Sequence, residues 1–73
     1  MDAPLPLTVK IRHLQIVGLL RDGLTDREIG NRLGLSPRTV SNNLAHLYAL
    51  TGVPSRAHLV SLFERGHLTL GGD

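Results

Sequence analysis

The chain has 73 residues, enough for one small domain, and it carries eight Lys and Arg against six Asp and Glu, a formal net charge of +2. It contains no cysteine, which excludes disulfides, thiolate zinc sites and cysteine nucleophiles. No apolar run approaches the ~20 residues of a membrane span, and the acidic start of the chain lacks the pattern of a signal peptide, so we expect a cytoplasmic protein.

The first eight residues contain Pro4 and Pro6, which disfavour a helix. Apolar residues alternate with others in the strand-like pattern of Leu5, Leu7, Val9 and Ile11. Nothing else in the sequence offers a partner strand, so we expect an extended arm here and no sheet.

A first helix follows the arm. Its broad apolar face consists of Leu14, Ile16, Val17, Leu19 and Leu20. The helix should end near Asp22, with Gly23 as its stop. Its start is open, because Thr8 could cap the helix and a start near Arg12 is equally consistent with the pattern.

Residues 25–52 predict two helices joined by a tight turn. Thr25 and Glu28 form a capping box at the start of the first, and Gly34 suits its left-handed C-terminal position. Ser36 is a good N-cap for the second, and Pro37 is a good first helical residue. So short a connection forces a sharp crossing between the two helices.

Three positions in this stretch indicate a DNA-binding helix-turn-helix. Gly30 is small where the following helix should cross, Gly34 makes the turn, and Val40 is apolar and should point into the angle between the helices. The alternative is a plain antiparallel helical hairpin, which does not need this glycine and this apolar residue at these places.

The helix over residues 37–51 has two distinct faces. Val40, Leu44 and Leu47 form one apolar stripe that should be core. The helical period places another set on the opposite side: Arg38, Asn42, Ala45, His46 and Ala49. That opposite face is flanked by Thr39, Ser41, Asn43 and Leu50.

If this helix enters a major groove, its first two turns meet the bases. Asn42 can pair with adenine, a contact worth ~1–3 kcal/mol of discrimination, and Arg38 can reach a guanine or a phosphate. Ser41 and Ala45 are small enough to let the helix sit close or to touch a thymine methyl. The alternative for Asn42, and more strongly for Asn43, is a polar position without a role in recognition.

The helix N-terminus and the charge distribution favour the same partner. Ser36 and Thr39 can hold a phosphate there. No acidic residue occurs between Ile29 and Phe63. That interval holds Arg32, Arg38, His46, Arg56 and His58. An acid-free, arginine-bearing middle suits a polyanion, although an ordinary solvated surface is an equally good interpretation of charge alone.

A short fourth helix is predicted from Arg56 to Arg65, stopped by Gly66. Its apolar residues cover an arc too wide for one buried face: Leu59, Val60, Leu62 and Phe63. We expect part of this arc to pack on the core and part on a second copy of the chain, the alternative being that all four are core. The remainder, from Leu68 onward, resembles a fraying terminus.

The sequence GLTDREIGNRLGLSPRTVSNNL, with GVPSR downstream, resembles the LuxR/FixJ (GerE) type of helix-turn-helix domain over roughly residues 9–68. The resemblance implies an all-helical fold that binds DNA as dimers on inverted repeats, with the third helix in recognition and the fourth in dimer contact. The matching positions are Ser36, Arg38, Thr39, Val40, Ser55 and Arg56.

The chain departs from the family pattern at several basic positions. The family usually has lysine at Ser41 and Leu50, histidine at Asn43 and often a basic residue at Ala45, whereas its first-helix glutamates are His13 and Gln15 here. It also usually has leucine at Thr51. Each lost phosphate contact weakens binding and lowers its salt dependence, so the affinity and the target sequence should differ from those of typical members.

We therefore expect an all-α, four-helix bundle-like domain containing a helix-turn-helix, with an extended arm over residues 1–8, the domain over 9–68 and a tail over 69–73. The expected DNA-binding residues are Ser36, Arg38, Thr39, Ser41, Asn42, Ala45, His46 and Arg56. The expected dimer residues are Leu59, Val60 and Phe63.

The expected function is sequence-specific binding of double-stranded DNA by a bacterial transcriptional regulator or its output domain. The expected partners are DNA, a second copy of the chain and, as a further candidate, RNA polymerase, with no membrane. We expect no cofactor, no metal and no enzymatic activity, since the four histidines are scattered and no catalytic motif is present. The alternative is a protein-binding module whose DNA face has degenerated, which an exposed Leu50 would favour.

Overall fold

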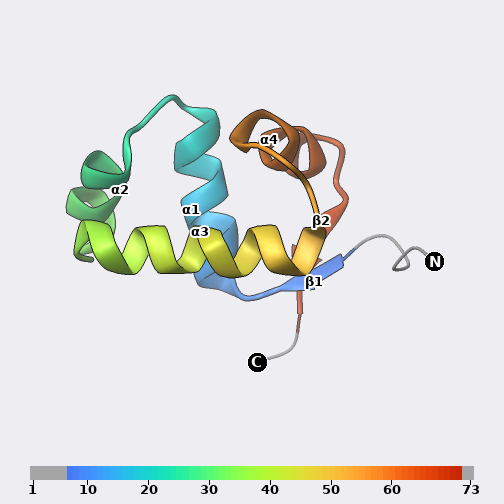
Figure 1. The fold of residues 1–73 in the computed structure, drawn as a ribbon, viewed down its shortest axis with the longest axis horizontal. Helices are drawn as coiled ribbons and strands as arrows, with labels where there is room; N and C mark the ends of the chain where they lie inside the picture. Colours follow the sequence, from blue (N-terminus) through green and yellow to red (C-terminus); the bar gives the residue numbers. More distant parts are fainter. Residues whose placement is uncertain (1–6, 72–73) are drawn as a thin grey trace.

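The computed structural model describes residues 7–71, and Figure 1 shows its four helices and one short strand pair. In chain order the elements are β1 (Leu7–Val9), α1 (Ile11–Arg21), α2 (Asp26–Leu33), α3 (Pro37–Thr51), α4 (Arg56–Glu64) and β2 (Leu68–Leu70). The helical architecture predicted from the sequence is confirmed. None of the four helices in this range has the length and apolarity needed to cross a membrane.

Every helix contributes to one aliphatic core. The fully buried side chains are Ile16 and Val17 from α1, Ile29 from α2, Val40 and Leu47 from α3, and Leu59 from α4. Full burial of one such side chain contributes about 1.5–3 kcal/mol. The apolar stripe predicted for α3 is therefore core, because Leu44 is also buried there.

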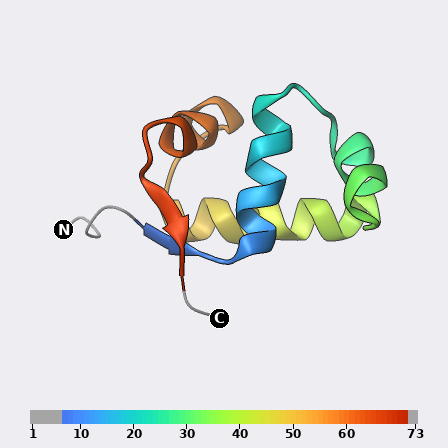
Figure 2. The same cartoon turned by 180° about the vertical axis from the view of Figure 1, so that it is seen from behind.

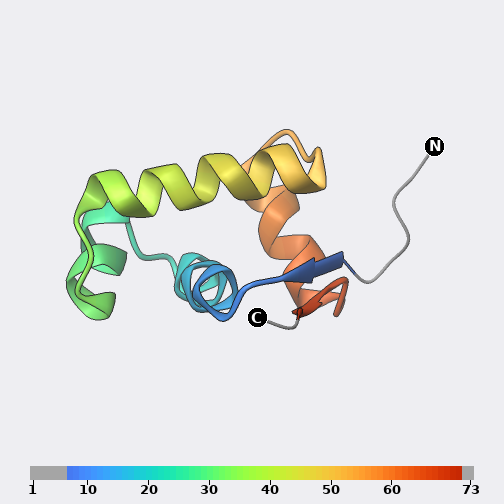
Figure 3. The same cartoon turned by 90° about the horizontal axis from the view of Figure 1, so that it is seen from below.

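The longest helix, α3, lies along the outside of the domain. Figure 2, seen from behind, shows α1 crossing α3, with α2 and α4 on either side of α1. In Figure 3 the other helices and both strands lie on the same side of α3. One face of α3 is thus held by the core, and the opposite face is left open.

The strand pair corrects the expectation that the chain contains no sheet. β1 and β2 pair in parallel, with Leu7 opposite Leu68 and Val9 opposite Leu70. The prediction of a fraying tail is also wrong for β2, since Leu68 is buried. Residues 1–6 of the predicted arm, with Gly72 and Asp73, lie outside the described residues.

The start of α1 agrees with one of the two predicted alternatives, the start near Arg12, and rules out a cap at Thr8. The N-cap is Lys10, and α1 begins at Ile11. Thr8 is unsuitable as a cap because it belongs to β1, where it lies opposite Thr69. The predicted end is right, because α1 stops at Arg21 and Gly23 follows with a φ of 89°.

Candidate nucleic-acid interface

The junction between α2 and α3 depends on a close approach of two backbone segments. A Cβ atom added at Gly30 would lie 2.4 Å from the carbonyl oxygen of Leu35. The Leu35 amide donates to the Gly30 carbonyl oxygen at 2.8 Å, and Gly34 turns the chain with a φ of 73°. We expected Gly30 to be small for a crossing helix, but its nearest neighbour is the turn itself. This turn sets the direction in which α3 leaves α2.

The N-terminus of α3 is closed by two hydroxyl side chains. The Thr39 amide donates to Ser36 Oγ at 3.1 Å, and Ser36 Oγ donates to Thr39 Oγ1 at 3.0 Å. Ser36 is exposed and Thr39 is half-buried. The cap therefore uses the Ser36 hydroxyl as both donor and acceptor, whereas the Thr39 hydroxyl hydrogen is not part of this pair.

The outer face of α3 carries most of the residues that the sequence placed there. The exposed side chains are Arg38, Ser41, Asn42, Ala45, His46, Ala49 and Leu50. Asn43 differs, because its side-chain amide donates to the Thr39 carbonyl oxygen of its own helix at 2.8 Å. Asn43 thus has a structural contact, whereas the neighbouring Asn42 is turned to the outside.

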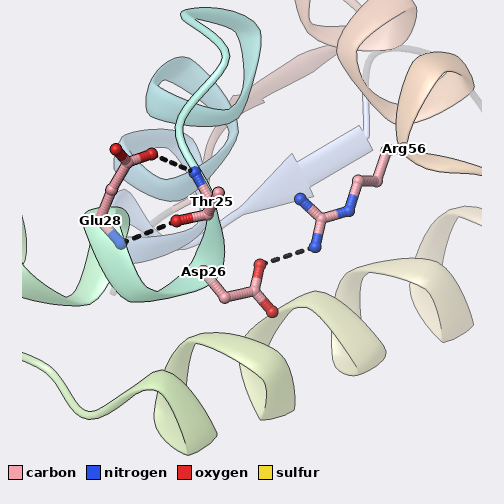
Figure 4. Close-up of polar contacts among 4 residues, drawn as sticks. All are labelled: Thr25, Asp26, Glu28 and Arg56. Carbon is pink, nitrogen blue, oxygen red and sulfur yellow. Dashed lines mark hydrogen bonds and ion pairs between the residues drawn. The ribbon is translucent and has the colours of Figure 1, made fainter.

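Arg56 forms an ion pair with a residue of another helix. Its guanidinium donates to Asp26 Oδ1 at 2.7 Å, and the two side chains are 50% and 29% exposed (Figure 4). Figure 4 also shows the capping box of α2, in which Thr25 and Glu28 exchange hydrogen bonds. This arrangement joins the N-termini of α2 and α4, so a phosphate would have to compete with Asp26 for Arg56.

The three residues expected at a dimer contact have different surroundings. Leu59 is fully buried in the core, which argues against a direct contact with a second copy. Phe63 is half-buried, with its ring against Gly18 and 5.4 Å from the Arg21 guanidinium carbon. Val60 is half-buried and lines a hollow between α4 and the α1–α2 connection. Val60 and Phe63 therefore keep some exposed surface on α4.

One buried histidine, His13, lies against a residue of the outer face of α3 and was not among the expected site residues. His13 is 5% exposed, and its ring packs edge-on against His46, with 5.5 Å between the centroids. Burial is the main cause that lowers the pKa of His13, and the nearby His46 and Lys10 lower it further. The signal was present in the sequence, because position 13 precedes the buried Ile16 and Val17 at helical spacing.

The described part of the chain, residues 7–71, contains no group of three or more His, Cys, Asp or Glu side chains arranged to hold a metal ion. The arrangement on α3 is instead suited to hydrogen bonding with an extended polar surface. It combines a rigid helix, an open outer face and amide and guanidinium donors in the first two turns.

Comparisons with known proteins agree with this geometry. The sequence model of the family described as "Bacterial regulatory proteins, luxR family" matches residues 8–63. A protein named as an HTH-type transcriptional regulator of Mycobacterium tuberculosis is 49% identical over 45 residues, which are 62% of this chain and 5% of that protein. The monoamine regulon transcriptional regulator of Klebsiella aerogenes is 40% identical over 60 residues, 82% of this chain and 26% of that protein. No solved structure matches the chain.

Proposed function

Because this chain belongs to the luxR family of bacterial regulatory proteins, we propose that it binds double-stranded DNA sequence-specifically through the outer face of α3. The observation that carries the proposal is the open face of α3, on which Arg38 and Asn42 are both exposed. No acidic residue lies in the sequence from 29 to 63, so this face carries no carboxylate of its own helix to repel a phosphate backbone.

In the proposed complex the N-terminal half of α3 enters the major groove. The Asn42 side-chain amide can donate to the N7 acceptor of adenine and accept from its N6 amino group. This pairing is worth ~1–3 kcal/mol of discrimination. Arg38 reaches a guanine or a phosphate, and Ser41 and Ala45 let the helix approach the bases. The backbone amides at the N-terminus of α3 and the Thr39 hydroxyl donate to a phosphate, and this contact fixes the register of α3 on the duplex.

We further propose that the DNA-bound form is a homodimer on an inverted repeat, with Val60 and Phe63 of α4 in the contact. Support comes from the partial exposure of both side chains and from the hollow that Val60 lines. A small domain buries a limited share of its surface, so a second copy would add apolar burial that one copy lacks. Analytical ultracentrifugation of the wild type and Val60→Asp with duplex DNA tests this: we expect two copies per duplex for the wild type and fewer for the variant, and a single copy for both at high concentration would contradict the proposal.

DNA binding itself is tested by fluorescence anisotropy with random-sequence duplex DNA at several salt concentrations, and selection of a preferred sequence from that pool then tests specificity. We expect the logarithm of the affinity to fall with the logarithm of salt by about 0.9 per phosphate neutralised. The double variant Arg38→Ala/Asn42→Ala should bind more weakly. Arg65→Ala, which removes the same charge from the C-cap of α4, is the matched control and should retain most of the affinity.

A second function has one observation in its favour. Leu50 is 44% exposed near the end of the outer face of α3, where an apolar side chain suits a protein partner. On this alternative the fold serves as a protein-binding module. Absence of any DNA binding at ~50 mM salt, where electrostatic contacts are strong, would favour the alternative over the DNA proposal.

A further inference from the structure

A hollow lies beside the C-terminal half of α3, where α3 meets β1 and the start of α1. We call it the His13 hollow, and its volume is about 280 Å³. It is lined by Thr8, Val9, Lys10, His13, His46, Leu50 and Gly71. None of these lining residues is acidic, and three of them carry nitrogen-bearing basic side chains.

His13 has a defined hydrogen-bonding state in this hollow. The Lys10 amide donates to His13 Nδ1 at 3.4 Å, so Nδ1 is the unprotonated nitrogen and the neutral ring carries its hydrogen on Nε2. Among residues 7–71 no acceptor is in hydrogen-bond contact with Nε2, and this atom keeps some solvent contact although the residue as a whole is only 5% exposed. The lowered pKa of His13 keeps the ring neutral near pH 7, so this lining residue of the hollow carries an Nε2–H donor that no protein acceptor uses.

Further donors surround the same space. The exposed Lys10 is the N-cap of α1, and it has no side-chain cap bond. His46 borders the hollow from the outer face of α3. Ammonium and imidazole donors without an adjacent carboxylate are groups that bind phosphate in proteins.

We propose that the His13 hollow binds a phosphate group, and that a backbone phosphate of the DNA held by α3 is its source. The inference rests on the proposed function for the identity of that source. The position beside His46 would put the phosphate at the edge of the face that meets the groove. Such a contact is independent of sequence, so it would hold the orientation of α3 on the duplex without reading a base.

The test compares Lys10→Gln with Arg65→Gln, which removes an equal charge from the end of α4 away from the hollow. The affinity of both variants for random duplex DNA is measured over a range of salt concentrations. We expect Lys10→Gln to lower the slope of log affinity against log salt by about 0.9, the loss of one phosphate contact, and Arg65→Gln to leave it unchanged. Thermal unfolding of both variants checks that the domain remains folded.

A second measurement on the unmodified protein avoids any effect of substitution on folding. The ring resonances of His13 and His46 are followed by NMR during titration with inorganic phosphate, with chloride at equal ionic strength as the control, and then with duplex DNA. We expect both rings to shift with phosphate and with DNA, and not with chloride.

The outcomes separate the two proposals. If DNA binds and depends on Arg38 and Asn42, but Lys10→Gln has the slope of Arg65→Gln and DNA shifts neither ring, the phosphate site is refuted and the DNA function stands. If DNA does not bind but inorganic phosphate shifts both rings, the DNA function fails and the hollow is a site for free phosphate. If neither ligand has an effect, both proposals fail.

Discussion

At the residue scale, the helix-turn-helix depends on the absence of a single side chain. The Cβ atom that any other residue would add at Gly30 meets a backbone oxygen, and backbone cannot move aside as the end of a side chain can. Gly18 provides the contrast, because an added Cβ would lie 3.7 Å from Phe63 Cζ, an ordinary contact distance. Two helical glycines therefore have different reasons to be present.

We predict that Gly30→Ala destabilises the domain by ~1–3 kcal/mol, the cost typical of overpacking. Gly18→Ala should be neutral or stabilising by up to about 1 kcal/mol, because alanine favours a helix over glycine. Urea unfolding of both variants measures the difference. Equal stability for the two variants would show that the approach of Leu35 to Gly30 is not tight in solution.

His13 makes the stability of the domain depend on pH. Its pKa is lowered from 6.5 in the folded state, so the unfolded chain binds the proton more readily than the folded domain does. Stability should therefore fall as the pH drops below about 6.5, and the loss should continue down to the pKa of the folded state.

The corresponding test measures the free energy of unfolding of the wild type and His13→Gln at intervals between about pH 5 and 8. The glutamine side chain retains an acceptor for the Lys10 amide and does not titrate. The wild type should lose stability relative to this variant on acidification. If the free energies of unfolding of the two proteins differ by the same amount at every pH in this range, the expected role of the buried imidazole is refuted.

At the element scale, polar contacts fix the ends of the helices and one ion pair joins two of them. The pair of Arg56 and Asp26 links α4 to α2, yet both side chains keep solvent contact, so its contribution to stability is at most about 1 kcal/mol. The ion pair should have a larger effect on the binding of a polyanion, because Asp26 neutralises the positive charge of Arg56.

We predict that Asp26→Asn changes stability by less than about 1 kcal/mol and tightens DNA binding at low salt, because Arg56 is released and one negative charge is removed. Asp22→Asn is the matched control: Asp22 is also paired with an arginine, Arg21, at 3.6 Å, but the pair lies at the end of α1. Anisotropy with duplex DNA compares the two variants. An equal gain in affinity would mean that net charge alone, and not the release of Arg56, is responsible.

At the scale of the whole molecule, the strand pair joins the two ends of the described chain. The Leu7 amide donates to the His67 carbonyl oxygen, and the Gly71 amide donates to the Val9 carbonyl oxygen, both at 2.7 Å. Leu68 fills the core beneath this pair, whereas Leu70 is 57% exposed. The pair thus closes the core at the end of the domain that holds the His13 hollow.

We predict that Leu68→Ala destabilises the domain by ~2–5 kcal/mol, as for other buried leucines. Leu70→Ala removes the same atoms from an exposed position in the same strand and should change stability by less than about 0.5 kcal/mol. Thermal or urea unfolding gives both values. If the two substitutions cost the same, the C-terminal strand does not pack on the core in solution.

The sequence by itself determined the features that depend on neighbouring residues. The capping box at Thr25, the turn at Gly34, the N-cap at Ser36 and the core stripe of α3 all follow from local backbone chemistry and the helical period. The direction of the outer face follows in the same way, because a residue opposite a buried stripe must face outward. Of the proposed recognition residues, Arg38 and Asn42 needed no tertiary information to be placed there.

Tertiary structure alone decided the contacts between distant segments. Three-residue strands are too short to be recognised singly, and β1 finds its partner only because the four helices bring the ends of the chain together. Residues from different helices likewise come together at three places. Arg56 pairs with Asp26, Leu59 is buried in the shared core, and His13 packs against His46. Periodicity specifies which face of a helix is buried, but packing specifies which residue of another helix that face meets.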